Sequence, residues 1–343
     1  MPVFSHLQVR NPNEDETPIE SATQIFASVL PYPYIPLLRR LLIVHPKTYA
    51  FEIYLLNQLV YFYVTTPKEN ETLIQSLVTS SFPQSKVAKT TDPMDIIFKS
   101  KHIALGEVVL NSYSYLPIKT YFDFKDVDPL SSLVGFLSKQ PAQIKMAVQI
   151  VVTPPYFAWQ DLAVKNAGLQ VYDENAARYV MNPQKLIIMK KATFQGGKVG
   201  IRLIAGTNTP GLNPAPFVAN LAGTFGSFSL GEGNQFVFRR PIFFKSWLMD
   251  RIKKRTLSYF EHKNQILNSQ ELATLWHPPG YLLAGIKNIS WGKTLIGEPP
   301  ENLPVADGAT EEQKKNINFF AKCEFRNKET IFGIKDADRR KHI

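Results

Sequence analysis

Cysteine is nearly absent from this sequence. Cys323 is the one cysteine in 343 residues, so no disulfide can form within the chain and no set of thiolates can hold zinc. So low a content fits a reducing compartment. The six histidines lack the i, i+3 or i, i+4 spacing that puts two ligands on one helix face; they are His6, His45, His102, His262, His277 and His342. The sequence therefore predicts neither a disulfide scaffold nor a metal site.

Long hydrophobic runs are also missing. The most apolar stretch, residues 35–44, is interrupted by Arg39 and Arg40. It is shorter than the run of about 20 apolar residues that a membrane-spanning helix needs. The beginning of the chain is polar and lacks the apolar segment of a secretory signal. From these two absences we expect a chain that is soluble as given.

The sequence has no motif of the form G-x-x-x-x-G-K-[ST], in which backbone N–H groups wrap a phosphate. The nearest match is Gly292-Lys293-Thr294, but the first glycine would have to stand at Lys287, and Gly285 is two residues too early. Trp291 would also crowd such a loop. A G-x-S-x-G elbow is absent too, and Cys323 has no motif context for a nucleophile. We therefore predict no catalytic residue in this chain and rank a nucleotide site at Gly292-Lys293-Thr294 last.

Apolar residues make up 44% of the chain and aromatic residues 12%, enough for buried cores and typical of a folded protein. β-Branched and aromatic runs alternate with short stretches of helical periodicity. Strands are expected at 49–55, 59–65, 107–110, 146–153, 186–189, 199–205 and 234–238, with helices at 19–30, 68–80, 130–137 and 214–228. Residues 56–58 are expected to form the hairpin between the first two strands. This alternation predicts an α+β fold with two ferredoxin-like α/β sandwich units, residues 1–165 and residues 166–260.

The last third has a different pattern. A basic helix is expected at 247–259. A short helix at 269–275 is expected to begin at Asn268, because Glu271 three residues later completes a capping box. Proline and glycine then punctuate residues 276–308, which favours an extended connector. Residues 261–343 therefore form a third region of short helices and connector.

The chain carries a net charge of +10, which favours a polyanionic partner. Cations concentrate between positions 239 and 255, where Asp250 is the one acid and Phe243, Phe244 and Trp247 are interleaved. Lysine and arginine neutralise phosphates, and aromatic rings can stack on bases. The sequence thus predicts a contact with DNA or another partner at Arg239, Arg240, Lys245, Arg251, Lys253, Lys254 and Arg255. The alternative is an amphipathic helix whose aromatic residues lie in the core and whose charges face solvent.

A series of short landmarks runs along nearly the whole chain. The sharpest are the helix that ends in His-Pro-Pro at 277–279 and the sequence Asp-Arg-Arg-Lys-His-Ile at 338–343. Others are Ala-Phe-Glu-Ile at 50–53, Val-Gln-Ile at 148–150 and Ile-Arg-Leu at 201–203. With these landmarks the sequence resembles the N-terminal region of conjugative DNA-transfer ATPases, the type IV secretion coupling-protein group within the FtsK–HerA superfamily. In such proteins the Asp-Arg-Arg-Lys-His segment immediately precedes the phosphate-binding loop, so we expect this chain to be a fragment that lacks the ATPase core.

The resemblance implies a non-catalytic N-terminal accessory domain of a DNA-translocating conjugation or secretion ATPase, which organises the motor and contacts DNA or channel proteins. It implies no cofactor in this chain, since ATP and Mg²⁺ would bind to the missing core, and no small-molecule substrate. The expected partners are DNA, secretion-channel proteins and further copies in a hexamer of the full-length protein. The expected location is cytoplasmic, with the inner face of the membrane as one option. The alternative is a self-sufficient scaffolding module without DNA binding.

Overall fold

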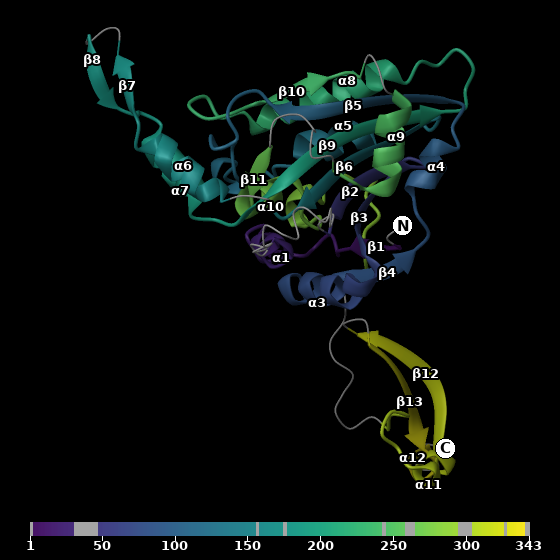
Figure 1. Ribbon diagram of the computed structural model, residues 1–343. Coiled ribbons are helices and arrows are strands. Elements are labelled where there is room, and N and C mark those ends of the chain that lie inside the picture. The colour runs from purple at the N-terminus through teal and green to yellow at the C-terminus, as the bar shows by residue number, and fades with distance from the viewer. Residues whose placement is uncertain are drawn as a thin grey trace.

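A computed structural model of the protein describes residues 3–30, 47–155, 158–173, 177–241, 245–257, 265–293, 304–325 and 328–339. Among these residues nine strands form one sheet, in the order β10-β5-β9-β6-β2-β3-β1-β4, with β11 paired to β9 (Figure 1). The pairs are antiparallel. The strands are β1 (Phe4–Arg10), β2 (Tyr49–Leu56), β3 (Leu59–Pro67), β4 (Lys86–Thr90), β5 (His102–Leu110), β6 (Ile144–Thr153), β9 (Gly196–Thr207), β10 (Phe236–Arg239) and β11 (Ile266–Asn268).

The two central strands β2 and β6 are covered on both faces, which explains why their sequences are almost continuously apolar. Strand β2 turns into β3 through a two-residue hairpin. Both turn residues, Asn57 and Gln58, have positive φ angles of 50° and 62°, the backbone geometry that suits the right-handed twist of paired strands. The hairpin predicted at 56–58 is therefore confirmed.

One face of the sheet carries the larger core. Its helices are α1 (Ser21–Val29), α3 (Glu71–Ser81), α5 (Ser131–Ser138), α8 (Ala215–Gly223) with the 3₁₀ turn η3 (Thr224–Phe228), and α10 (Ser269–Leu275). Trp276, which follows α10, is fully buried. Its ring lies 5.1 Å from that of Phe51 on β2 and 6.5 Å from that of Phe26 on α1. An aromatic cluster thus joins a helix from the start of the chain, a central strand and the segment after α10.

The opposite face carries a smaller core beneath α4 (Met94–Phe98) and α9 (Lys245–Lys254). Because side chains alternate along a strand, the β2 residues Phe51 and Ile53 belong to the larger core and Tyr54 to the smaller one. Glu52 lies on the same side as Tyr54. The sheet therefore presents polar side chains toward α4 and α9.

Two parts extend from this body (Figure 1). The first, called the arm below, consists of α6 (Trp159–Ala167), β7 (Gln170–Asp173), β8 (Arg178–Met181) and α7 (Lys185–Ala192). The second is a hairpin of β12 (Ile317–Phe325) and β13 (Lys328–Lys335), flanked by α11 (Glu311–Lys315) and α12 (Asp336–Arg339). Short 3₁₀ turns complete the description: η1 (Lys68–Asn70), η2 (Tyr121–Asp123) and η4 (Tyr281–Leu283).

The α+β class predicted from the sequence is confirmed. The strands that we expected in two units lie in one sheet, because β9 pairs along its length with both β5 and β6. The start of the expected connector also packs on the body, where Trp276, Leu283 and Ile289 are buried. The helix start at Asn268 is confirmed with its complete capping box.

The strand predicted at 186–189 is wrong, because these residues lie within the helix α7. Ile188 packs against the α6 face formed by Trp159, Ala163 and Ala167. Tertiary packing thus overrides the β preference of the Ile-Ile pair at 187–188. The far end of the predicted helix at 247–259 and the tail at 340–343 lie outside the described residues. In the described part of the chain, no helix is long and apolar enough to cross a bilayer.

Candidate functional site

A buried polar network lies on the face of the sheet beneath α9. It is built on three strands that each carry one strongly polar side chain within an apolar run: Glu52 on β2, Gln149 on β6 and Arg202 on β9. The antiparallel register places Gln149 opposite both Glu52 and Arg202. All three side chains are 0% exposed. Buried polar groups are costly unless they are hydrogen-bonded, so their partners decide what the network does.

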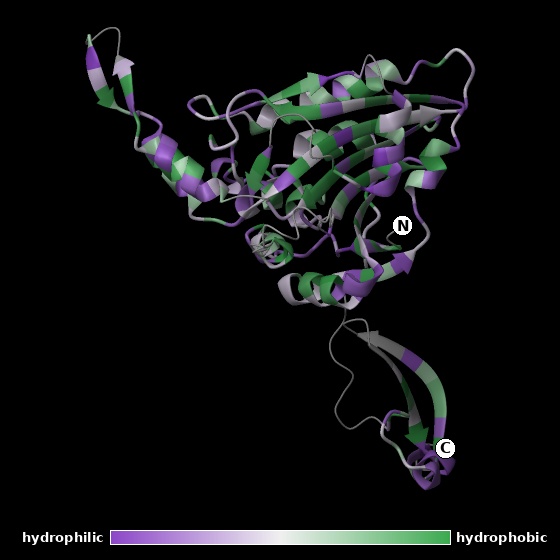
Figure 2. Cartoon of the chain, viewed as in Figure 1, coloured by the Kyte–Doolittle hydropathy of each residue, from purple (hydrophilic) through white to green (hydrophobic). Residues whose placement is uncertain are grey.

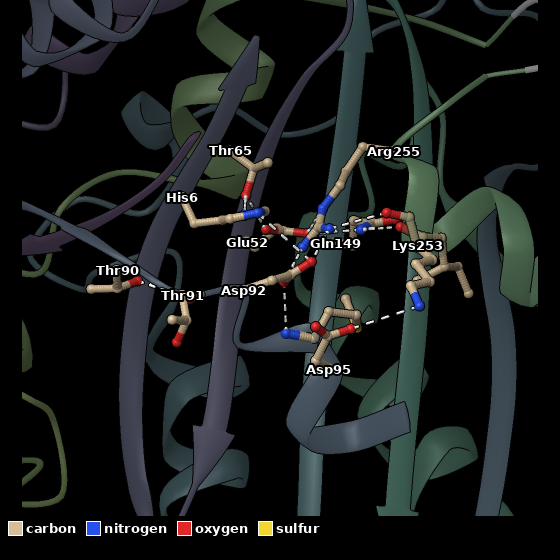
Figure 3. Close-up of polar contacts among 12 residues, drawn as sticks. His6, Glu52, Thr65, Thr90, Thr91, Asp92, Asp95, Gln149, Lys253 and Arg255 are labelled. Atoms are coloured by element: carbon tan, nitrogen blue, oxygen red, sulfur yellow. Dashed lines mark hydrogen bonds and ion pairs between the residues drawn. The ribbon is translucent and has the colours of Figure 1, made fainter. Parts of the chain in front are cut away.

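Glu52 is the centre of this network (Figure 3). Its Oε2 accepts a hydrogen bond from the hydroxyl of Thr65 at 2.7 Å, and its Oε1 accepts one from Nε2 of Gln149 at 2.7 Å. The Nε of Arg255 also donates to Oε1, at 3.2 Å. Both carboxylate oxygens are therefore engaged inside the protein.

The last turn of α9 is held to the sheet by the same network. Arg202 donates from Nη1 to the backbone carbonyl of Arg251 at 3.2 Å and from Nη2 to that of Thr256 at 2.6 Å. Gln149 donates to the carbonyl of Ile252 at 3.1 Å. Side chains of the sheet thus satisfy carbonyl groups at the helix end, which otherwise lack partners.

The side of the network nearest to solvent consists of His6 and Asp92. Nη2 of Arg255 donates to Oδ1 of Asp92 at 2.6 Å. Nε2 of His6 lies 3.8 Å from Oδ2 of Asp92, and the side chains are 14% and 16% exposed. Nδ1 of His6 lies 3.1 Å from the hydroxyl of Thr65, which connects this edge back to Glu52.

Burial and charge act in opposite directions on the titratable groups of the network. Burial alone would lower the pKa of Arg255, but the Glu52 and Asp92 carboxylates raise it well above its usual value. Burial would raise the pKa of Asp92, yet the hydrogen bond and charge of Arg255 lower it overall. Burial lowers the pKa of His6 more than Asp92 raises it. Near neutral pH the network therefore holds a charged Arg255, an ionised Asp92 and a neutral His6.

This arrangement favours a structural role. A general base needs a free lone pair within reach of a substrate proton, but both oxygens of Glu52 accept bonds from the protein. Arg255 is an ion-paired group that does not give up its proton. What the network achieves is to fix the end of α9, and the chain that follows it, on the sheet.

The cations of the basic segment that was predicted as a contact surface are of two kinds in the structure, buried and exposed. Arg255 is 1% exposed and Arg251 5% exposed. The guanidinium of Arg251 lies 4.5 Å from the ring of Trp247, and its Nη2 donates to the carbonyl of Thr256. The prediction that Arg251 and Arg255 face a partner is therefore corrected, because both side chains are used in holding the end of α9.

Three further cations of the segment stand beside acidic side chains. Arg239 is opposite Glu107 in the register of β10 and β5. Nζ of Lys253 lies 4.0 Å from Asp95, and Nζ of Lys254 lies 2.8 Å from Asp250. These pairs are at the surface, where each is worth roughly 0–1 kcal/mol, but the nearby acids reduce the attraction for an anion.

Arg240 and Lys245, the last two members, meet at a surface cavity of about 400 Å³. Lys101, which precedes β5, and His102, its first residue, line the same cavity. All four side chains are exposed, and Nζ of Lys245 donates to the carbonyl of Ile103 at 2.6 Å. No carboxylate belongs to the lining formed by described residues. Phe243 and Phe244, which we expected beside these cations, lie outside the residues that the structure describes.

Two other buried polar pairs lie near the larger core. Nε2 of His277 is 3.2 Å from Oδ2 of Asp128, while Nδ1 lies 2.8 Å from the carbonyl of Ala273. Both ring nitrogens thus have partners within the chain. Lys191 and Glu271 are each 0% exposed at the side chain and 3.0 Å apart. Burial lowers the pKa of Lys191, partly offset by the Glu271 carboxylate.

The glycine of the near-match at 292–294 has a local partner. The N–H of Gly292 donates to the carbonyl of Asn11 at 2.8 Å. Just before it, Ile289 forms an isolated parallel bridge with Val60 on β3. The described part of the near-match is therefore a segment that packs along the body, while Thr294 lies outside the described residues.

The sequence reasoning missed Glu52, Gln149 and Arg202 as network members, and Lys101 and His102 as cavity residues. A signal for the first three exists, because each is a strongly polar residue with an apolar β-strand residue on either side. Each also lies within one of the landmarks at 50–53, 148–150 and 201–203. Lys101 and His102 had no such signal, since their place beside Arg240 depends on the pairing of β5 with β10.

Across the described ranges, no group of three or more His, Cys, Asp or Glu side chains is placed to hold a metal ion. No protein-family model matches the chain, and no curated protein matches it either. The resemblance to coupling proteins therefore stays a prediction, and the function has to be argued from the geometry above.

Proposed function

We propose that this chain is a non-catalytic accessory domain of a DNA-translocating ATPase of the conjugation and secretion type, and that it contacts the phosphate backbone of DNA at the cavity of Lys101, Arg240 and Lys245. Following the resemblance, the domain organises a hexameric motor in the cytoplasm, at the inner face of the membrane. Channel proteins are further partners, and ATP and Mg²⁺ bind to the motor core and not to this domain.

The convergence of cations at one cavity is the observation that carries the DNA contact. Lys101 precedes β5, Arg240 follows β10, and Lys245 opens α9, so residues far apart in sequence meet there. The hydrogen bond from Lys245 to the carbonyl of Ile103 fixes the side chain. Because a carbonyl group carries no net charge, this bond leaves the positive charge of Lys245 unneutralised. Side chains that neutralise phosphates release counterions and so gain affinity for any DNA sequence. The contact is therefore of the positioning kind and carries no base recognition.

The alternative, a scaffolding module without DNA binding, is favoured by a different observation. Five of the seven cations predicted as a contact surface, namely Arg239, Arg251, Lys253, Lys254 and Arg255, are buried or stand beside acids. On this alternative the net charge of +10 serves solubility alone, and association with a protein partner would not depend on salt.

Fluorescence anisotropy with a labelled DNA duplex separates the two functions. The proposal predicts binding whose log K falls linearly with the logarithm of the salt concentration, with a slope of about −0.9 for each phosphate neutralised. The scaffold alternative predicts no binding at low salt. Sequence-scrambled duplexes should bind equally well, since backbone contacts carry no sequence information.

A further inference from the structure

The arm is unusually rich in exposed apolar side chains for a part of a folded protein. Among the described residues 21 large apolar side chains are exposed, and nine of them lie between positions 162 and 189. Such a concentration marks an interaction site. The nine are Leu162, Val164, Leu169, Val171, Tyr172, Tyr179, Met181, Leu186 and Met189.

The base of the arm is anchored firmly to the body. Trp159, Ala163 and Ala167 form one buried face of α6, at helical spacing, and pack with Ile188 of α7. At the end of α7 the buried Lys191 pairs with Glu271 at 3.0 Å. Its Nζ also donates to the carbonyls of Leu116 and Ile266, at 3.2 and 3.1 Å. The exposed side chains are therefore presented from a fixed support.

The outer part of the arm has no second layer among the described residues. Strands β7 and β8 form a two-stranded sheet of their own, and an isolated ribbon of this kind is at best marginally stable in water. Tyr172 and Tyr179 pair across it, with ring centroids 5.3 Å apart. Because side chains alternate along a strand, Val171 points to the face opposite to that of Tyr172, yet the two are 44% and 52% exposed. Both faces of the ribbon thus present apolar groups to solvent.

Apolar groups lie on opposite sides of this thin projection. A single flat protein surface could cover only one of these sides, whereas a lipid layer can surround both. The hydropathy colouring shows green segments on the helices and strands of the arm, separated from the main core (Figure 2). Exposed cations accompany them: Lys165 on α6, Arg178 on β8 and Lys190 on α7. The acids in this stretch of the sequence are Asp161, Asp173 and Glu174. Asp173 stands opposite Arg178 in the register of β7 and β8, so Lys165 and Lys190 are the cations without an acid opposite them in that register. Aliphatic groups, tyrosines and basic residues together are the composition of segments that lie in the interface of a bilayer with anionic headgroups.

We propose that the arm inserts into the interfacial region of an anionic lipid surface, with Tyr172, Tyr179, Met181 and Leu186 among the acyl chains and headgroups. Helices α6 and α7 have nine and eight residues, far fewer than the roughly 20 that span a bilayer, so the arm lies in one leaflet. Lys165 and Lys190 meet the headgroup phosphates. This contact does not depend on the DNA contact proposed above, and the two experiments fail separately.

Co-sedimentation of the full chain with phosphatidylcholine vesicles, with and without phosphatidylglycerol, tests this proposal. We expect binding to the anionic vesicles only. A variant with Tyr179→Ser, Met181→Ser and Leu186→Ser should bind them at least about tenfold more weakly, because it loses apolar area buried in the interface. Lys165→Glu with Lys190→Glu should give a similar loss, since each basic residue near the surface contributes attraction.

A matched control removes exposed apolar side chains elsewhere. Leu73→Ser, Ile96→Ser and Phe320→Ser act on side chains that are 46%, 44% and 67% exposed, and this variant should bind vesicles like the unmodified protein. Absence of vesicle binding, or equal binding by the arm variant, would overturn the proposal. Concentration-dependent self-association that the arm variant loses, without vesicle binding, would also overturn it and assign the arm to a second copy of this chain.

Discussion

Arg255 and Glu52 stand 203 positions apart in the sequence, and their side chains meet inside the protein with Nε 3.2 Å from Oε1. The two side chains are 1% and 0% exposed, so loss of Arg255 would leave the Glu52 carboxylate buried without a cationic partner. The pair joins the end of α9 to a central strand of the sheet. The chain between β10 and β11 is therefore fixed at this point by electrostatics as well as by the apolar residues Leu248 and Ile252.

Arg255→Ala should destabilise the protein by about 3–5 kcal/mol, because Glu52 and Asp92 then lose their cationic partner in a buried site. Urea denaturation followed by circular dichroism measures this change. Lys253→Ala is the matched control, since its side chain is 65% exposed and lies 4.0 Å from Asp95; it should change the free energy of unfolding by less than about 1 kcal/mol. Equal effects of the two substitutions would contradict the network.

His6 should make the stability depend on pH below its ordinary pKa of 6.5. The folded protein holds His6 with a lowered pKa, so the unfolded chain binds the proton more readily as the pH falls. The stabilising contribution is therefore complete above pH 6.5 and is lost as the pH drops through the folded-state pKa.

Urea unfolding at pH 7 and pH 5 tests this expectation with His6→Gln as the comparison. The unmodified protein should lose more stability between these pH values than the variant, by at most about 1.4 kcal/mol per pH unit, the limit for one proton. Parallel pH profiles of the two proteins would show that His6 is not the responsible group.

Glu271 supports both the start of α10 and the base of the arm. Its Oε1 accepts from the N–H of Ile118 at 2.9 Å, and its Oε2 accepts from the N–H of Asn268 at 2.8 Å and from Lys191. Glu271→Ala leaves the buried Lys191 without a carboxylate to balance its charge and leaves two buried N–H groups without partners, so we expect a loss of about 3–5 kcal/mol. Asn268→Ala removes the capping side chain and should cost about 1–2 kcal/mol. Chemical denaturation would contradict this ranking if Asn268→Ala were the more damaging substitution.

Local structure was largely predictable from the sequence, and long-range arrangement was not. The capping box at Asn268 and Glu271 and the hairpin after Leu56 depend on neighbouring residues, and both are confirmed. The single sheet depends on β9 entering between β5 and β6, which no local pattern specifies. The strand predicted at 186–189 failed because burial of Ile188 against Trp159 decides the local conformation.

The candidate site shows the same division. The sequence singled out Arg240 and Lys245, but it could not separate them from Arg251 and Arg255, because position within a basic run does not reveal which face is buried. Lys101 became a candidate only when β5 and β10 were seen to pair. Glu52, Gln149 and Arg202 could have been recognised as a buried network from their isolated positions in apolar strands, but not their common partner at the end of α9.

DNA binding by two matched charge variants tests the central claim most directly. Lys101→Gln, Arg240→Gln and Lys245→Gln remove three cavity cations, whereas Arg239→Gln, Lys253→Gln and Lys254→Gln remove three cations that stand beside acids. The account predicts that the cavity variant loses affinity for a DNA duplex and that its slope of log K against log salt falls by about 2.7, or about 0.9 for each phosphate contact. The second variant should bind nearly as the unmodified protein does. Unchanged affinity and salt slope in the cavity variant, or absence of DNA binding by the unmodified protein at low salt, would contradict it.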